Sequence, residues 1–193
     1  MNENSHKGVS KQYSSSLLDE LEMLKCDKNT NIWSCVTLKG LQIFKLKLQK
    51  NDMKATEKKK LLLEDVCKAL KCSNLQHVKE LLIDIGKALH SNGYNVKTCK
   101  IKASSRILIG TNESFGKIVF EVGLSFDPVL NVPFIPGSSL KGAFRYALMD
   151  LVEREKSKEI AKEVADIAFG SKDWSGLVGV TDAYPVKAGI NDL

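Results

Sequence analysis

The sequence predicts an α+β protein: a helical region that ends at Gly93, followed by helices packed on one face of an antiparallel sheet. Three observations lead to this prediction. Apolar residues recur at helical spacing up to Gly93. Residues 118–126 alternate in the way that marks a half-buried strand. A run rich in glycine and serine, ending at Ser139, leads into a second amphipathic stretch.

The first part of the chain divides into a tail and a helical region. Residues 1–14 are polar and are expected to be disordered, and residues 15–93 form the predicted helical region. Within it, residues 32–48 fit both a strand and a helix, and we favour the helix. Residues 52–70 read as a helix, and another is expected to begin at Ser73 as N-cap and to end near Gly93.

After Gly93 the pattern changes, and residues 94–193 are predicted to form a second domain. The expected order is strand, strand, helix, helix, strand, at residues 96–101, 118–126, 140–151, 157–168 and 177–180. This order is typical of an α+β arrangement, because the strands are not separated by regular crossover helices.

Composition narrows the class of protein. The chain has 193 residues, of which 43% are hydrophobic and 27% charged, as in ordinary globular proteins. Its formal net charge is +6 and its pI about 9.0, which favours an acidic partner, most commonly nucleic acid. A lysine-rich solubilising surface would give the same numbers. No run is long and apolar enough for a bilayer, so we expect a cytoplasmic protein without membrane contact.

Neither the cysteines nor the acidic residues predict a metal site. The chain has five cysteines, and none lies at zinc-finger spacing from a second pair or a histidine. We expect reduced thiols that pack as small hydrophobic side chains. Asp127 and Asp182 each follow a predicted strand. Together they could hold a cation, but aspartates in such places more often cap the next turn.

The most informative segment is residues 133–145, PFIPGSSLKGAFR. A helix N-terminus presents free backbone N–H groups and the positive end of the helix dipole, which suits a phosphate. The segment supplies the following candidate phosphate-binding residues: Gly137, Ser138, Ser139, Lys141, Gly142 and Arg145. A well-capped helix start would look similar. Basic residues near a helix N-terminus are unfavourable unless an anion is present, which favours the binding site.

Other groups of residues give weaker evidence for a functional site than this segment does. The loop Ser104-Ser105-Arg106 reads equally well as a turn or as a phosphate- or sugar-binding loop. The motif is no Walker A loop, because neither Lys-Ser nor Lys-Thr follows Gly142. The three histidines are distant from it in sequence, and the two serines have no evident base. We therefore expect no catalytic residue and no cofactor.

Four stretches, SSRILIG, PFIPGSSLKGAFR, FG and GLVGVTDAYP, resemble the RAMP superfamily of CRISPR-associated proteins, and in particular subunits of the type III-B Cmr complex. The resemblance covers residues 96–185. It implies a ferredoxin-like, RRM-like domain whose glycine-rich motif engages RNA. It also implies a place in an antiviral effector, near the 3′ end of the guide (CRISPR) RNA. The implied partners are guide and target RNA and other Cmr subunits, especially the repeated RAMP backbone subunit.

Carried over onto this chain, the resemblance assigns RNA contacts to Ser105 and Arg106 in the loop after the first strand, besides the six residues of the motif. It implies no catalytic residue here. The alternative within the superfamily is a guide-RNA-processing endoribonuclease, which needs a general base and acid beside the scissile phosphate. Relatives continue past the DAYP stretch, so the domain is expected to be incomplete at its C-terminus or completed by a partner chain.

Overall fold

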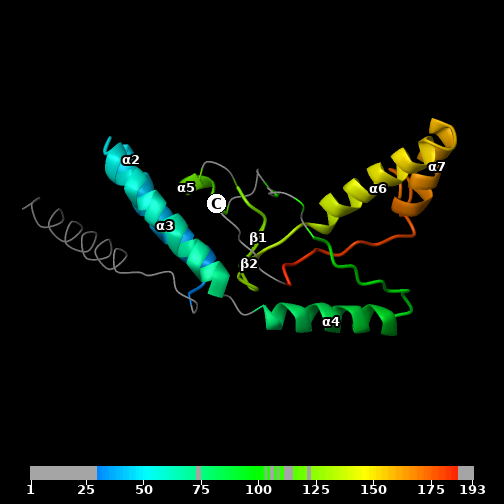
Figure 1. Ribbon diagram of the computed structural model, residues 1–193, viewed down its shortest axis with the longest axis horizontal. Coiled ribbons are helices and arrows are strands. Elements are labelled where there is room, and N and C mark those ends of the chain that lie inside the picture. Colours follow the sequence, from blue (N-terminus) through cyan, green and yellow to red (C-terminus); the bar gives the residue numbers. More distant parts are fainter. Residues whose placement is uncertain are drawn as a thin grey trace, which may run out of the picture. The chain divides into compact units, whose positions relative to one another are not determined.

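The computed structural model describes residues 30–72, 75–102, 104, 107, 109–110, 115–120 and 123–186. The chain divides into two compact units: the first takes in Met1–Pro133 and Pro185–Leu193, and the second is Phe134–Tyr184. Figure 1 shows their helices and strands. The tail at 1–14 and the loop residues Ser105 and Arg106 lie outside the described residues. The domain limits expected at residues 15, 94 and 193 stay predictions.

Two long helices, α2 (Ile32–Leu48) and α3 (Asp52–Cys72), pack on each other in the first unit. The start of α2 is capped by Asn31, whose side-chain oxygen accepts from the Ser34 N–H at 2.9 Å. Ile32, Val36 and Ile43 recur at helical spacing and are buried. The helix favoured for this ambiguous stretch is therefore confirmed, because its apolar residues find a helix rather than a sheet to pack on.

Three aromatic rings stack on one another in the core of the first unit. The Phe115 ring stacks on Trp33 with centroids 5.0 Å apart and on Phe126 at 4.3 Å. Cys35 is fully buried beside them and is disulfide-bonded, so the expectation of reduced thiols is wrong at this position. Cys67 and Cys99 are free, as expected.

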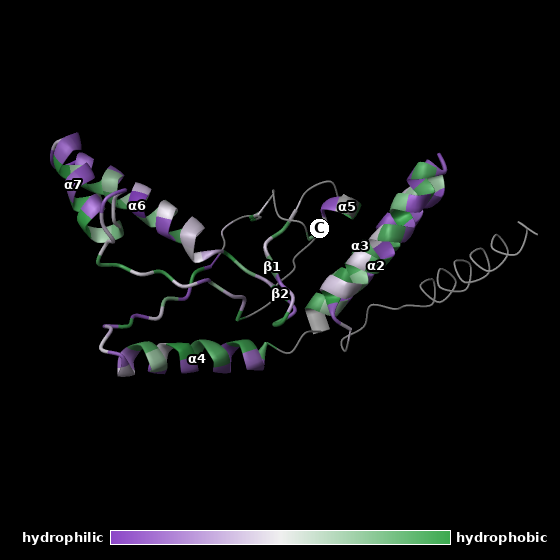
Figure 2. Ribbon diagram, turned by 180° about the vertical axis from the view of Figure 1, so that it is seen from behind, coloured by the Kyte–Doolittle hydropathy of each residue, from purple (hydrophilic) through white to green (hydrophobic). Residues whose placement is uncertain are grey.

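Helix α4 (Gln76–Ser91) has one apolar side, seen in green along its length in Figure 2. Leu75 is its N-cap and makes no side-chain cap bond. The expected cap, Ser73, lies outside the described residues. At the other end, the Asn92 side-chain amide donates to Ala88 O at 2.7 Å, and Gly93 adopts φ +86°, a conformation that favours glycine.

The predicted strand at 118–126 is wrong over most of its length. Residues Lys117–Phe120 form a short helix, α5, and Val119 is buried where α5 packs against α2. A short, nearly continuous apolar run does not distinguish a strand from a buried helical turn, which explains the error. The strand is limited to β1 (Phe126–Asp127), paired antiparallel with β2 (Val132–Pro133).

The strands expected at 96–101 and 177–180 are also absent from the described part of the chain, because neither stretch has a ladder partner there. Those described residues hold one two-stranded sheet and several helices. The α+β class is confirmed in this coarse form. The ferredoxin-like sheet implied by the resemblance stays a prediction.

The second unit is a helical hairpin of α6 (Gly137–Glu153) and α7 (Lys158–Phe169), and both predicted helices are confirmed. Ser157 caps α7 and accepts from the Ile160 N–H. The pKa of Glu159 lies below its usual value because the carboxylate accepts hydrogen bonds. The larger effect comes from the backbone N–H of Glu159 and the smaller from the Ser157 hydroxyl. Helix α7 ends at Gly170, with φ +91°.

Candidate functional site

The start of α6 is tied to a segment that follows 45 residues later. Ile135 and Ala183 form an antiparallel bridge with both N···O distances at 2.9 Å, and the Phe134 and Tyr184 rings stack at 5.7 Å. The Gly137 N–H donates to Asp182 Oδ1 at 2.6 Å. Asp182 therefore caps the N-terminus of α6. Of the two roles considered for this residue, cation ligand and cap, the structure shows the cap.

Asp127 has the same kind of role in the first unit. Its Oδ1 accepts from the backbone N–H groups of Val129 at 2.8 Å and Leu130 at 2.9 Å. These bonds hold the turn between β1 and β2. No group of three or more His, Cys, Asp or Glu residues within the described ranges is placed to hold a metal ion.

The backbone of residues 180–181 leaves room only for a glycine at position 137. A Cβ at this position would lie 2.4 Å from Val180 O and 2.9 Å from the Thr181 carbonyl carbon. Both are backbone atoms, which cannot rotate away as a flexible side chain would. The absence of a side chain at Gly137 therefore makes room for the backbone of residues 180–181, and the part of Gly137 in RNA binding stays a prediction.

Little of the predicted phosphate cradle at the N-terminus of α6 is open. The Ser139 and Leu140 N–H groups both donate to Pro136 O, at 3.0 and 3.1 Å, and the Gly137 N–H is taken by Asp182. Of these first four N–H groups, only that of Ser138 has no acceptor among the described residues. An incoming phosphate would also meet the Asp182 carboxylate, which already satisfies the positive end of the dipole.

Arg145 links α6 to the end of α7. Its guanidinium donates to Gly170 O at 2.6 Å and to Ala165 O at 3.1 Å, and it forms an ion pair with Asp166. A cation at the C-terminal carbonyls of a helix is favourable. The end of α7 therefore supplies the negative partner for Arg145 that the sequence analysis expected a bound anion to supply. The part of Arg145 in RNA binding stays a prediction.

The other motif residues form an accessible surface on α6. Ser138, Ser139 and Gly142 are exposed, and a Cβ built at Gly142 would meet nothing within 4 Å. The half-buried Lys141 makes no ion pair or hydrogen bond with a described residue. Tyr146, one turn beyond Gly142, is 76% exposed. Sequence reasoning missed this tyrosine, although an aromatic residue on the polar side of a helix is a usable signal.

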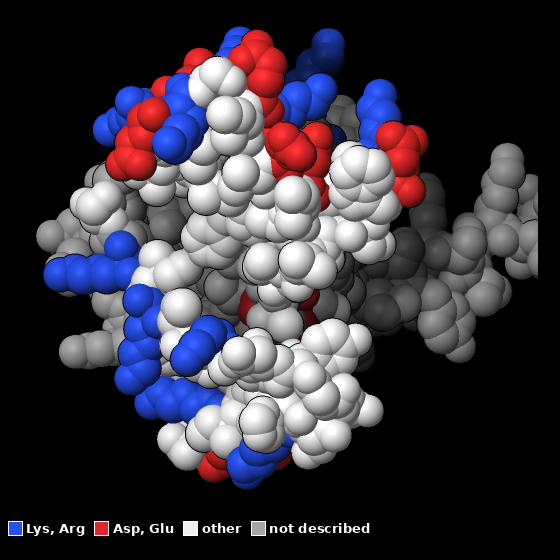
Figure 3. Space-filling view, turned by 90° about the vertical axis from the view of Figure 1, so that its right-hand side faces the viewer, with Lys and Arg blue, Asp and Glu red and all other residues white. Residues whose placement is uncertain are grey.

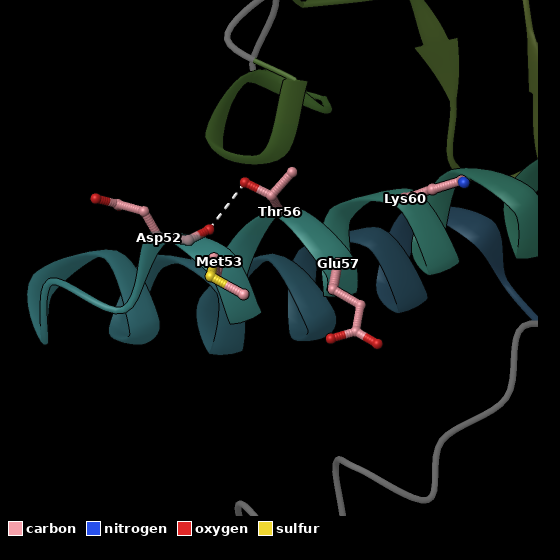
Figure 4. A pocket seen from close by; sticks show the side chains of 5 residues that line it. All are labelled: Asp52, Met53, Thr56, Glu57 and Lys60. Carbon is pink, nitrogen blue, oxygen red and sulfur yellow. Dashed lines mark hydrogen bonds between the residues drawn. The ribbon is translucent and has the colours of Figure 1, made fainter.

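A separate hollow of about 550 Å³ lies on the first unit, along the outer side of α3. Asp52, Met53, Thr56, Glu57 and Lys60 line it. Figure 4 shows the two carboxylates pointing apart, while the Thr56 hydroxyl donates to the backbone oxygen of Asp52 at 2.8 Å. The three charged side chains that line the hollow form no ion pair or hydrogen bond with one another.

Comparison with known proteins finds a family match that covers this site. Residues 100–192 match the model of the RAMP superfamily. The matched residues include all of the motif and Asp182.

Two particular proteins are similar to the chain. Over 150 residues, or 76% of this chain, it is 35% identical to the CRISPR system CMR subunit Cmr6 of Saccharolobus solfataricus, and it spans about half (50%) of that relative's length. It also resembles a chain in the cryo-EM structure of the type III-B Cmr-beta bound to cognate target RNA. The TM-score is 0.62 with 22% identity, covering 92% of this chain and 69% of that one, which supports the fold alone.

Among the described helices, none combines the length and the apolar character needed to cross a membrane.

Proposed function

We propose that the chain is a non-catalytic, RNA-binding subunit of a type III-B CRISPR (Cmr) effector complex. The single observation that carries this is the 35% identity to Cmr6 over most of the chain, and the basic net charge of +6 agrees with it. The subunit would hold guide RNA near its 3′ end. It would contact target RNA and other Cmr subunits, especially the repeated RAMP backbone subunit, in the cytoplasm. A ferredoxin-like arrangement of the complete domain belongs to the same proposal.

The accessible part of α6 gives this function a specific form. The hydroxyls of Ser138 and Ser139 and the free N–H of Ser138 suit phosphate or 2′-hydroxyl groups, which carry no sequence information. Lys141 adds a charge that no described acid neutralises. Arg145 then acts mainly as a positioning residue, because it fixes α6 on α7.

The test is the salt dependence of RNA affinity. Lys141→Ala is expected to weaken binding and to reduce the slope of log K against log salt by about 0.7, as for one lost phosphate contact on a single strand. Lys162→Ala is the matched control, because Lys162 is an exposed lysine on α7 in the same unit. Equal slopes for the two variants would contradict phosphate contact at Lys141.

The non-catalytic part of the proposal is tested separately. The second unit, Phe134–Tyr184, contains no histidine, so it lacks the usual general acid and base for cleaving RNA without metal. Purified protein incubated with CRISPR repeat RNA and a chelator should leave the RNA intact. Cleavage at one defined site, abolished by a point substitution in this chain, would favour the endoribonuclease instead.

A further inference from the structure

We propose that the basic segment, residues 94–102, is a second contact for the RNA backbone, with Tyr94 stacking on a base. This inference rests on the proposed RNA-binding function. It assigns that function a surface outside the α6 motif and in the other compact unit of the chain.

The distribution of charge favours a contact outside the second unit. Phe134–Tyr184 contains seven Lys and Arg against eight Asp and Glu, so the net charge of +6 comes entirely from the rest of the chain. Affinity for a polyanion depends on how many phosphates are neutralised. The α6 motif, with Lys141 as its available cation, provides one such contact, and the first unit, which carries the excess of basic residues, is the better source of further contacts.

The lysines of α2 are poor candidates for that contact. Of the three lysines of α2, Lys39 is already paired with Asp65 at 3.2 Å and Lys47 also has a partner, which leaves the exposed Lys45. Large apolar side chains are also exposed on α2: Leu41, Phe44 and Leu48 are 50%, 49% and 70% exposed. Such a helix face suits a protein neighbour better than a phosphate chain.

The basic segment has the opposite properties. Lys97, Lys100 and Lys102 are exposed, and none forms an ion pair or hydrogen bond with a described residue. The described residues from 85 to 102 contain no acid. Figure 3 shows one face of the molecule, with Lys and Arg side chains gathered along its lower left.

The backbone of the segment is also available. It follows α4 without helix or strand, and from Asn95 to Lys102 no backbone hydrogen bond joins it to another described residue. At about 3.3 Å per residue, an extended chain spaces these lysines about 7 and 10 Å apart, which suits contacts along a single strand. Tyr94, at the start of the segment, is 64% exposed, and exposed aromatic rings beside basic grooves stack bases.

Two other roles fit a lysine-bearing extended segment: protection of an unpaired edge from aggregation, and binding to a protein. The charge imbalance favours RNA, because edge protection does not require the complete absence of acids. The three roles differ in the salt dependence of RNA binding.

The experiment compares two triple variants of the full chain, after circular dichroism has shown that both fold. Lys97→Ala/Lys100→Ala/Lys102→Ala removes the proposed contact. Lys54→Ala/Lys60→Ala/Lys68→Ala removes three exposed lysines of α3 in the same unit and is the charge-matched control. Binding of a fluorescent single-stranded RNA is titrated at several salt concentrations. The first variant should reduce the slope of log K against log salt by about 2, and the control by much less.

Two further variants sharpen the result. Lys97→Arg/Lys100→Arg/Lys102→Arg should keep the wild-type slope, because phosphate contacts need charge. Tyr94→Ala should weaken binding roughly tenfold with the slope unchanged, as expected for a lost stacking contact.

The outcomes separate the two proposals. Wild-type protein that fails to bind RNA would overturn the RNA-binding function, and this inference with it. RNA binding with equal slopes for both triple variants would overturn the inference alone. Unchanged RNA binding with loss of binding to other Cmr subunits would also overturn it and would identify the segment as a protein interface.

Discussion

Replacing Gly137 with alanine is expected to lower the free energy of unfolding by about 3 kcal/mol. The new Cβ would lie 2.4 Å from Val180 O, so the backbone of residues 180–182 would have to move. That movement would also weaken the bond from the Gly137 N–H to Asp182 and the bridge between Ile135 and Ala183. Urea unfolding followed by circular dichroism measures the loss.

Gly142→Ala is the control for Gly137→Ala, because both replace a glycine of α6. A Cβ at Gly142 meets no atom within 4 Å, so this variant should be more stable than the wild type by about 0.5–1 kcal/mol, the helix preference of alanine over glycine. A Gly137→Ala protein that unfolds at the wild-type urea concentration but loses RNA affinity would show that this glycine serves a ligand and not the fold.

Arg145→Ala is expected to cost about 2 kcal/mol of unfolding free energy, less than a fully buried pair because Arg145 is 30% exposed. The substitution leaves the Asp166 carboxylate and the carbonyl oxygens of Ala165 and Gly170 without their donor. Arg145→Lys should recover little, because an ammonium group does not reproduce the planar guanidinium that reaches all three acceptors. Thermal and urea unfolding measure these differences.

Arg154→Ala is the control for Arg145. Arg154 pairs with Asp150 on the same helix, but its side chain is 71% exposed, so its loss should cost less than about 0.5 kcal/mol. If the Arg145 and Arg154 variants are equally stable, and the Arg145 variant shows a reduced RNA salt slope, then Arg145 is a phosphate contact as the motif suggested and not a link between α6 and α7.

The long helices could be predicted because their signal is local. Residues 32–48, 52–70 and 157–168 carry apolar side chains at helical spacing, and Ser157 and Gly170 mark the two ends of α7. The strand predictions failed for the opposite reason. A strand exists only where another strand pairs with it, and the apolar run at 118–126 contains no information about that partner.

The candidate site shows the same division. The sequence by itself determined that the chain contains a glycine- and serine-rich helix start of the RAMP type, because that pattern lies within thirteen consecutive residues, 133–145. Only the tertiary structure decided what those residues do. Asp182 reaches the first N–H of α6, the backbone of Val180 excludes any side chain at Gly137, and Arg145 bonds to the end of α7. These partners are distant in sequence. The local sequence had suggested that a bound ligand provides an anion beside the basic residues of α6, and in the folded chain a carboxylate provides it.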